Sequence, residues 1–362
     1  MLVAKYKKEL PALMNINCQP CVSVIMPFEP KMNSKTALAH SLKIAADKIK
    51  NELHINYAKN VANEVWEKLM NAINHLDYTT HKKSIAIYVS PEIEKIYYLD
   101  ILVNEKVMVD SSFEIRDIVM NKQDKHEFLL LVISEKKEKI YYGNLNKLQL
   151  IVSNYAERVH RDLPEAVANF TDAATIKETD LKKFLHYVDN RLPHLLKYYP
   201  LPLFVLGTKK TMGYFKAITI HGQYITGFVH GNFDDATEAE LMKAIEPQLQ
   251  NWSVVKETHL MNYLRIAEDN LNLVSGIHDV WLNANRRHKQ LLVVEKDFYC
   301  PAFVTEKGET IFCKSNIDTT VITKDAVDDI IERVLENGGD VEFVDALNKY
   351  DRIALTDDNH NK

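Results

Sequence analysis

The chain has 362 residues, of which 46% are hydrophobic and 26% charged, with a formal net charge of −5. This length predicts two or three domains. The acidic balance excludes a global basic field for nucleic acid, so any RNA contact must depend on shape and on local basic residues. No apolar run approaches the roughly 18 residues that span a membrane, and the four cysteines make no disulfide framework. We expect a soluble, cytoplasmic protein without a membrane partner.

The first segment, residues 1–125, combines apolar alternation with helical periodicity. In chain order it predicts a strand at 21–28, helices from Ser34 and over about 57–76, and strands at 84–90 and 95–101. The first helix is expected to bury Ala37, Leu38, Ile44, Ile49 and Leu53. The charged stretch that runs on to about Lys125 indicates a linker.

The second segment, residues 126–258, alternates strands and helices. The predicted strands are 127–134, its hairpin partner 137–145, 149–152, 201–207 and 224–229. A helix capped by Thr179 is expected to kink at Pro193, and its buried face is predicted to be Leu181, Phe184, Leu185, Val188, Leu192 and Leu195. Another helix is predicted over 235–249, and the polar stretch from Asn154 to about Thr175 has no clear periodicity.

The third segment, residues 259–362, opens in a long helix that precedes Gly276. Its later elements are predicted as a helix over 277–287, a strand over 290–297, a helix from Ala326, and strands within 340–345 and 351–356. Gly338 and Gly339 close the helix in the usual C-terminal way. Strand–helix alternation along the whole chain predicts a mixed α+β fold, with α/β layers around mixed or parallel sheets.

Three stretches of this sequence resemble the archaeo-eukaryotic peptide chain release factor and Pelota superfamily. The tail resembles the end of that family's third domain, and it reads DDIIERVLENGGDVEFVDALNKYDRIALT. An upstream stretch also resembles that domain, GIHDVWLNANRRHKQLLVVEKDF. The hairpin that opens the family's second domain is matched by LLLVISEKKEKIYYGNL. The chain is most similar to the bacterial branches of this superfamily.

The resemblance implies three domains: an N-terminal α/β domain over 1–125, an RNase-H-like, release-factor-like middle domain over 126–258, and an L7Ae-like C-terminal domain over 259–362. Members of the superfamily bind the ribosomal A site, and their third domain contacts a translational GTPase. The implied partners are therefore the ribosome with its rRNA and a translational GTPase. The resemblance implies no cofactor.

The chemistry of release is missing from the sequence. Release factors carry a Gly-Gly-Gln tripeptide before the long helix of the middle domain, where glycines let the backbone approach the ester. The equivalent stretch here, 158–175, contains no glycine. His221-Gly222-Gln223 is the nearest look-alike, and a turn between strands is the better interpretation of it. We therefore predict no catalytic residue and a Pelota-like binding factor, in ribosome rescue or hibernation.

Local basic residues are the candidates for contacts. The predicted RNA or ribosome contacts are Arg158, His160, Arg161, Lys31 and Lys35, and the predicted partner contacts are Arg286, Arg287 and Lys289. A solvated polar loop is the alternative for the group at 158–161, and a solvated helix face is the alternative for the two lysines. For the cluster at 286–289 the alternative is charge complementation at a helix C-terminus.

Two further patterns resemble ligand sites. Cys18 and Cys21 have metal or redox spacing, and Cys300 and Cys313 lie in a hairpin-like insertion, but two local ligands do not complete a structural zinc site. We expect ordinary thiols and no bound metal. Gly207-Thr-Lys-Lys-Thr-Met-Gly213 follows a predicted strand but lacks the spacing of a phosphate loop.

Two other functions stay open beside ribosome binding. The middle domain would act as an RNA or ester hydrolase in one of them. Metal-dependent hydrolysis needs several carboxylates around the ions, and the predicted strands LLLVIS and LFVLG carry none. In the other, the chain is an interaction protein repurposed outside translation. We favour a binding role over an enzymatic one.

Overall fold

The structure is a computed structural model, and it describes residues 20–121, 126–145, 147–155, 173–286, 289–305, 311–312, 320–323 and 325–357. Helices and strands are mixed along these residues, which confirms the predicted mixed α+β class. They form two compact units, one made of the residues up to 121 with those from Val274 on, and one made of those between 126 and Leu273. The division into three domains at 125 and 258 stays a prediction. Among the described helices, none has the length and apolar character to cross a membrane.

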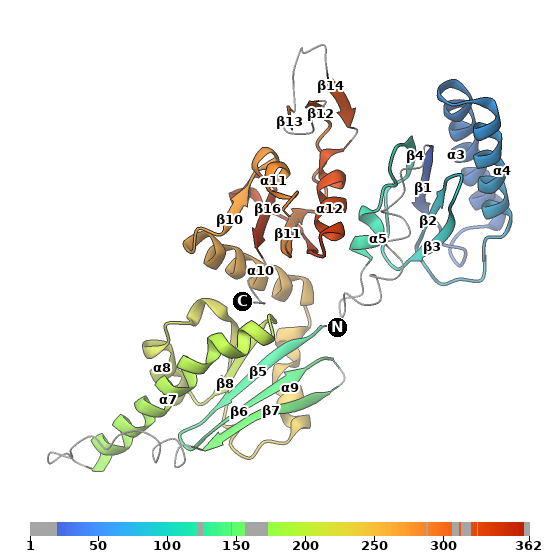
Figure 1. Ribbon diagram of the computed structural model, residues 1–362. Coiled ribbons are helices and arrows are strands. Elements are labelled where there is room, and N and C mark those ends of the chain that lie inside the picture. Colours follow the sequence, from blue (N-terminus) through green and yellow to red (C-terminus); the bar gives the residue numbers. More distant parts are fainter. Residues whose placement is uncertain are drawn as a thin grey trace. The chain divides into compact units, whose positions relative to one another are not determined.

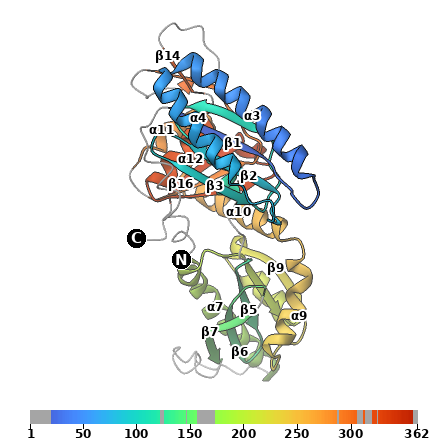
Figure 2. The same cartoon turned by 90° about the vertical axis from the view of Figure 1, so that its right-hand side faces the viewer.

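The N-terminal part of the first unit, residues 20–121, is built on an antiparallel sheet of order β3-β2-β1-β4. Its strands are β1 (Cys21–Pro27), β2 (Ser84–Val89), β3 (Glu94–Leu99) and β4 (Lys106–Asp110). Two long helices, α3 (Lys35–Asn56) and α4 (Lys59–Asn74), lie side by side (Figure 2) and bury one face of this sheet. The predicted helices and the first three strands are confirmed.

Helix α3 begins where the sequence predicts, because the side chain of Ser34 accepts a hydrogen bond from the Ala37 amide at 3.2 Å. Its buried residues are Leu38, Leu42, Ala45, Ala46, Ile49 and Leu53. The prediction was wrong for Ala37 and Ile44, which are exposed. A single position turns a helix by about 100°, so residues one step away from a buried row face solvent.

The predicted linker before Lys125 is wrong as well. It contains β4 and a short helix, α5 (Arg116–Met120). The charged residues that suggested a linker, Glu114, Arg116 and Asp117, are buried. All three form ion pairs in the folded chain. A run of charged residues in this stretch therefore does not indicate exposure to solvent.

The C-terminal part of the first unit has a sheet of order β10-β16-β11-β15. Its strands are β10 (Leu273–Ser275), β11 (Gln290–Glu295), β15 (Asp340–Val344) and β16 (Ile353–Asp357), and its helices are α11 (Ile277–Asn283) and α12 (Ala326–Glu336). β11 pairs in parallel with β15 and antiparallel with β16. Gly338 takes the left-handed conformation, φ +79°, that closes α12 as predicted. A small sheet, β12 (Ala302–Thr305), β13 (Ile311–Phe312) and β14 (Thr320–Thr323), forms the predicted insertion.

The second unit is a five-stranded sheet of order β7-β6-β5-β8-β9. Its strands are β5 (Phe128–Ile133), β6 (Lys137–Gly143), β7 (Leu148–Tyr155), β8 (Leu203–Gly207) and β9 (Ile225–His230). The first three are antiparallel, and β8 joins β5 and β9 in parallel. This mixed sheet with its helices fits the RNase-H-like fold that the resemblance implies.

Helices cover both faces of this sheet (Figure 1). One face packs against α7 (Ala173–Tyr198) and α8 (Lys209–Ile218), and the other against α9 (Glu238–Leu249) and the start of α10 (Trp252–Asp269). Helix α7 begins at Ala173, so the predicted cap at Thr179 is wrong and lies inside the helix. The predicted buried face of α7 is confirmed except at Leu195, which is half-buried beside the buried Leu196.

Candidate functional site

The sequence that stands in place of the release tripeptide joins β7 to α7. β7 ends at Tyr155 and α7 begins at Ala173. The predicted contacts Arg158, His160 and Arg161 lie between them, outside the described residues. What the structure does describe is the frame: the strand that enters this segment and the helix that leaves it.

A buried carboxylate on α7, Asp189, holds the turn that contains the Gly-Gln look-alike. It is 2% exposed and accepts hydrogen bonds from the Thr219 hydroxyl and, at 3.1 Å, from the Ile220 amide. The Nδ1 atom of His221 lies 3.1 Å from Oδ2 of Asp189, in an electrostatic contact. Gly222 then opens a short 3-10 turn that leads from α8 into β9. These contacts account for His221-Gly222-Gln223 as a fixed turn, although it follows a helix and not a strand.

A second buried carboxylate, Glu138, lies on β6 beside the strand that enters the undescribed segment. Its Oε2 atom accepts a hydrogen bond of 3.0 Å from the Asn154 amide group of β7 and lies 3.7 Å from Nη1 of Arg191 on α7. Oε1 has no hydrogen-bond partner among the described residues. Burial raises the pKa of Glu138, against the opposing effects of Asn154 and Arg191. The sequence did not indicate this site, because Glu138 lies in a hairpin strand of alternating polar and apolar residues. The polar residues of such a strand are expected to face water.

The structure brings Lys31 and Lys35 to one place, next to the segment that follows α4. The Nζ atom of Lys35 lies 4.8 Å from the ring centroid of Tyr78, a cation–π distance. Hydrogen bonds from Thr79 lower the pKa of Asp77, and the charge of Lys31 acts in the same direction. Both lysines are exposed. Their role as RNA contacts stays a prediction.

The basic cluster at the end of α11 is described in part. Arg286 and Lys289 are exposed and flank Arg287, which lies outside the described residues. The amide of Arg286 donates to the Asn283 carbonyl at 3.2 Å, so the cluster follows the last turn of α11 directly. This placement suits both charge complementation at the helix end and a partner contact.

The structure describes two of the four cysteines. Cys21 and Cys300 are buried, and the thiol of Cys21 donates to the Ser111 carbonyl at 3.6 Å. Cys18 and Cys313 lie outside the described residues. The part of the chain with assigned positions contains no group of three or more histidine, cysteine or acidic residues arranged to hold a metal ion.

Gly207 and Gly213, the glycines of the weak phosphate-loop pattern, have different surroundings. Gly207 ends β8, and a Cβ there would lie 2.8 Å from the Ile133 carbonyl oxygen, whereas a Cβ at Gly213 in α8 would meet nothing within 4 Å. We expect Gly207→Ala to lower the free energy of unfolding by about 1–3 kcal/mol. Gly213→Ala should raise it by about 0.5–1 kcal/mol, because alanine favours the helix.

Urea unfolding followed by circular dichroism measures both glycine variants against the parent chain. The two substitutions add the same methyl group six positions apart in the sequence, so each is the control for the other. Changes of the same sign would contradict the close approach of β8 to the Ile133 carbonyl as the reason for glycine at 207.

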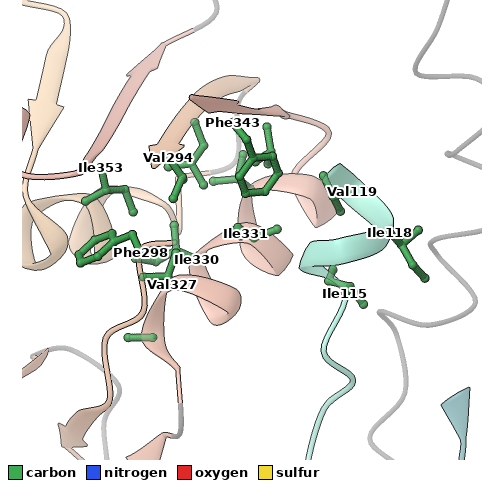
Figure 3. Packing of buried hydrophobic residues seen from close by; sticks show 14 of the residues in the cluster. Ile115, Ile118, Val119, Val294, Phe298, Val327, Ile330, Ile331, Phe343 and Ile353 are labelled. Atoms are coloured by element: carbon green, nitrogen blue, oxygen red, sulfur yellow. The ribbon is translucent and has the colours of Figure 1, made fainter. Parts of the chain in front are cut away.

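A buried cluster of charged groups in the first unit lies between α5 and the start of α12. Arg116, 5% exposed, donates from Nη2 to Asp325 Oδ2 at 2.5 Å, from Nε to Asp328 Oδ1 at 2.7 Å, and from Nη1 to the Phe298 carbonyl at 2.6 Å. On the other side, Nζ of Lys106 lies 2.6 Å from Glu114. The apolar residues of α5 lie beside those of α12 and β15 in this region (Figure 3). The sequence gives no local signal for this cluster, because Arg116 lies 182, 209 and 212 positions from its three acceptors.

Most of the second unit and the start of the C-terminal part match a known protein family. Residues 127–287 match the family described as bacterial archaeo-eukaryotic release factor family 3. The suspected resemblance to this bacterial branch is confirmed. The matched range begins at the first strand of the release-factor-like sheet and continues through α11. No curated protein sequence matches the chain.

Solved structures also match, at low identity. An archaeal translation termination factor, aRF1, is 13% identical with a TM-score of 0.26, over 98% of this chain and 97% of that one. Pelota of Thermoplasma acidophilum is 10% identical with a TM-score of 0.24, over 78% and 82%. Dom34 of S. cerevisiae, a translation termination-like factor that interacts with Hbs1, is 13% identical with a TM-score of 0.31, over 78% and 82%.

Proposed function

We propose that this chain is a cytoplasmic, ribosome-associated factor of the Pelota kind, which binds ribosomes in rescue or hibernation without hydrolysing peptidyl-tRNA. The observation that carries the proposal is the match of residues 127–287 to a release-factor family in a chain whose sequence contains no Gly-Gly-Gln tripeptide. A release-factor-like scaffold is thus kept while the residues that approach the ester are replaced.

The surroundings of the look-alike tripeptide support the binding role over release. His221-Gly222-Gln223 is tied to α7 through Asp189, and its single glycine lies in a 3-10 turn. A catalytic tripeptide needs a backbone that can approach the substrate closely. The favoured contacts are therefore electrostatic, through Lys31 and Lys35 to RNA phosphates and through Arg286 and Lys289 to a protein partner such as a translational GTPase.

Sedimentation with purified bacterial ribosomes through a sucrose cushion tests the proposal. We expect the chain to pellet with ribosomes, and we expect no release of peptide from ribosomes carrying peptidyl-tRNA above the rate in buffer. Absence from the pellet with both growing-cell and stressed-cell ribosomes would exclude the binding role. Peptide release at a rate that depends on this chain would exclude the non-hydrolytic role.

Charge reversal tests the lysine contacts within the same assay. Lys31→Glu with Lys35→Glu should weaken binding and reduce the slope of log affinity against log salt by about two, one for each lost phosphate contact. The matched control is Lys59→Glu with Lys95→Glu, which makes the same charge change at exposed positions of the same part of the chain. Equal losses in both pairs would assign the effect to overall charge.

A further inference from the structure

We propose that the contact around Arg116 is a releasable clasp, through which the N-terminal part (20–121) and the C-terminal part (274–357) of the first unit join and separate as folded bodies. The proposal does not depend on ribosome binding. Three hydrogen bonds cross from one part to the other at this place, and Arg116 donates each of them.

One half of the clasp is fixed to the N-terminal part. The Glu114 carbonyl accepts a hydrogen bond of 2.6 Å from the Tyr88 hydroxyl, and the Glu114 amide donates to the Ser23 hydroxyl at 3.0 Å. Lys106 of β4 adds ion pairs to Glu114 and, at 3.0 Å, to Asp117. Arg116 is therefore held on the N-terminal sheet by bonds that the C-terminal part does not share.

The other half is fixed to the C-terminal part. Oδ1 of Asp325 caps α12 by accepting from the Val327 amide at 3.1 Å, and it also accepts from the Cys300 amide at 3.0 Å. Asp328 lies in the first turn of the same helix. These bonds leave Oδ2 of Asp325 directed at Arg116, so the acceptors keep their places when Arg116 leaves.

Three features make this contact suited to release. Each part has its own sheet and helices, so neither depends on the other for its secondary structure. The contact buries ionised groups, whose desolvation offsets much of the attraction between them. Val119 of α5 lies beside Ile331 and Phe343 (Figure 3), within a buried apolar cluster that has members in both parts. The chain between the two parts forms the separate second unit.

The cluster also holds more acids than bases, with Glu114, Asp117, Asp325 and Asp328 against Lys106 and Arg116. Burial and a hydrogen bond with Glu114 raise the pKa of Asp328 well above its usual range. The pKa of Glu114 is lowered. Burial raises this pKa, but the hydrogen bond with Asp328 and the charge of Lys106 lower it by more. Asp328 therefore binds its proton more tightly in the closed clasp than a free aspartate does. Tyr88 and Tyr299 also face these carboxyl groups.

The sign of the pH effect follows from Asp328. Its pKa is higher in the closed contact than in water, so closure binds a proton that the open form releases. The proton on Asp328 therefore favours closure below the pKa of Asp328 in the closed form, and this contribution is lost as the pH rises through that pKa.

Two Asp-to-Asn substitutions test the two carboxyl acceptors of Arg116 separately. In Asp328→Asn the amide oxygen still accepts from Nε of Arg116 and the NH₂ group donates to Glu114, which copies the protonated acid. In Asp325→Asn the oxygen is needed by the Val327 and Cys300 amides. Its NH₂ group then faces Nη2 of Arg116, donor against donor. We expect the first variant to stay closed and the second to open, as should Arg116→Met.

Single-molecule energy transfer between labels at Lys59→Cys and Leu282→Cys measures the opening in the full chain, with Cys18 and Cys313 replaced by serine and the buried Cys21 and Cys300 kept. Both label sites are exposed, one in each part. We expect the low-transfer fraction to rise from below about a tenth to more than a half in Asp325→Asn and Arg116→Met. In the parent chain that fraction should grow as the pH rises, and in Asp328→Asn it should grow less, because Asp325, whose pKa burial also raises, remains.

Parent-like transfer in Asp325→Asn and Arg116→Met would overturn the clasp, and so would opening in Asp328→Asn equal to that in Asp325→Asn. Circular dichroism shows whether each variant is folded. If either loses helix signal, Arg116→Lys replaces it, because lysine keeps the charge but lacks the fork that reaches three acceptors. A folded Arg116→Lys protein that stays fully closed at every pH would also overturn the proposal.

Discussion

Replacing Phe184 with alanine is expected to lower the free energy of unfolding of the second unit by about 3–5 kcal/mol. Phe184 lies on α7, is fully buried, and packs in the cluster that joins α7 and α8 to the sheet. The substitution removes the ring and leaves a cavity that the close-packed strands on one side cannot fill.

Urea unfolding measures this loss, and hydrogen exchange followed by mass spectrometry assigns it to peptides of β5, β8 and α7. Tyr198→Ala is the matched control, since Tyr198 is an aromatic residue on the same helix but 79% exposed. Its effect should stay within about 0.5 kcal/mol. Equal effects at the two positions would contradict the packing of α7 against the sheet through Phe184.

The second large effect concerns Glu332 of α12. Burial, with the charges of Glu336 and Asp329, raises the pKa of Glu332 to about 7 from its ordinary 4.5. Between pH 4.5 and about 7, Glu332 is therefore protonated in the folded chain and ionised in the unfolded chain. The free energy of unfolding consequently falls as the pH rises through this range. Glu332→Gln removes this cost, so it should raise the free energy of unfolding by up to about 3 kcal/mol at pH 8 and by little at pH 4.

Urea unfolding of Glu332→Gln and the parent chain at pH 4 and pH 8 checks the size and the sign. Glu336→Gln is the comparison, one turn further along α12 and more exposed. It removes the repulsion of Glu332 and a carboxyl group whose own pKa burial raises, and it should give a smaller gain at pH 8. A gain for Glu332→Gln that is the same at both pH values would show that its carboxyl group does not titrate between them.

The periodicity of the sequence was sufficient for most elements and for their buried faces. The strand run at 128–133 and the helix that buries Leu181, Phe184 and Leu185 are confirmed, because apolar residues at strand or helix spacing have one energetically favourable place, against the core. Element ends were less secure. The start of α7 at Ala173 was missed because Thr179 has the side chain of a cap and sits inside the helix instead.

The candidate site divides in the same way. The absence of Gly-Gly-Gln is a property of the sequence alone, and the proposal of a non-hydrolytic role depends on it without any coordinates. The anchoring of His221 by Asp189 could not be predicted, because the two residues lie on separate elements that only the packing of α7 against the turn at 219–221 brings together. Glu138 was missed for a similar reason, since Glu138 lies on β6 and its charged neighbour Arg191 lies on α7.

The sequence by itself determined the mixed α+β class, the resemblance to release factors and the loss of their tripeptide, because these depend on residue types and on spacings within a single element. The tertiary structure decided the meaning of the charges. The stretch before Lys125, a linker by composition, holds Arg116, whose three acceptors come from residues near 300 and from the start of α12. Burial of a charge depends on partners that the fold supplies from distant positions, and no local pattern contains them.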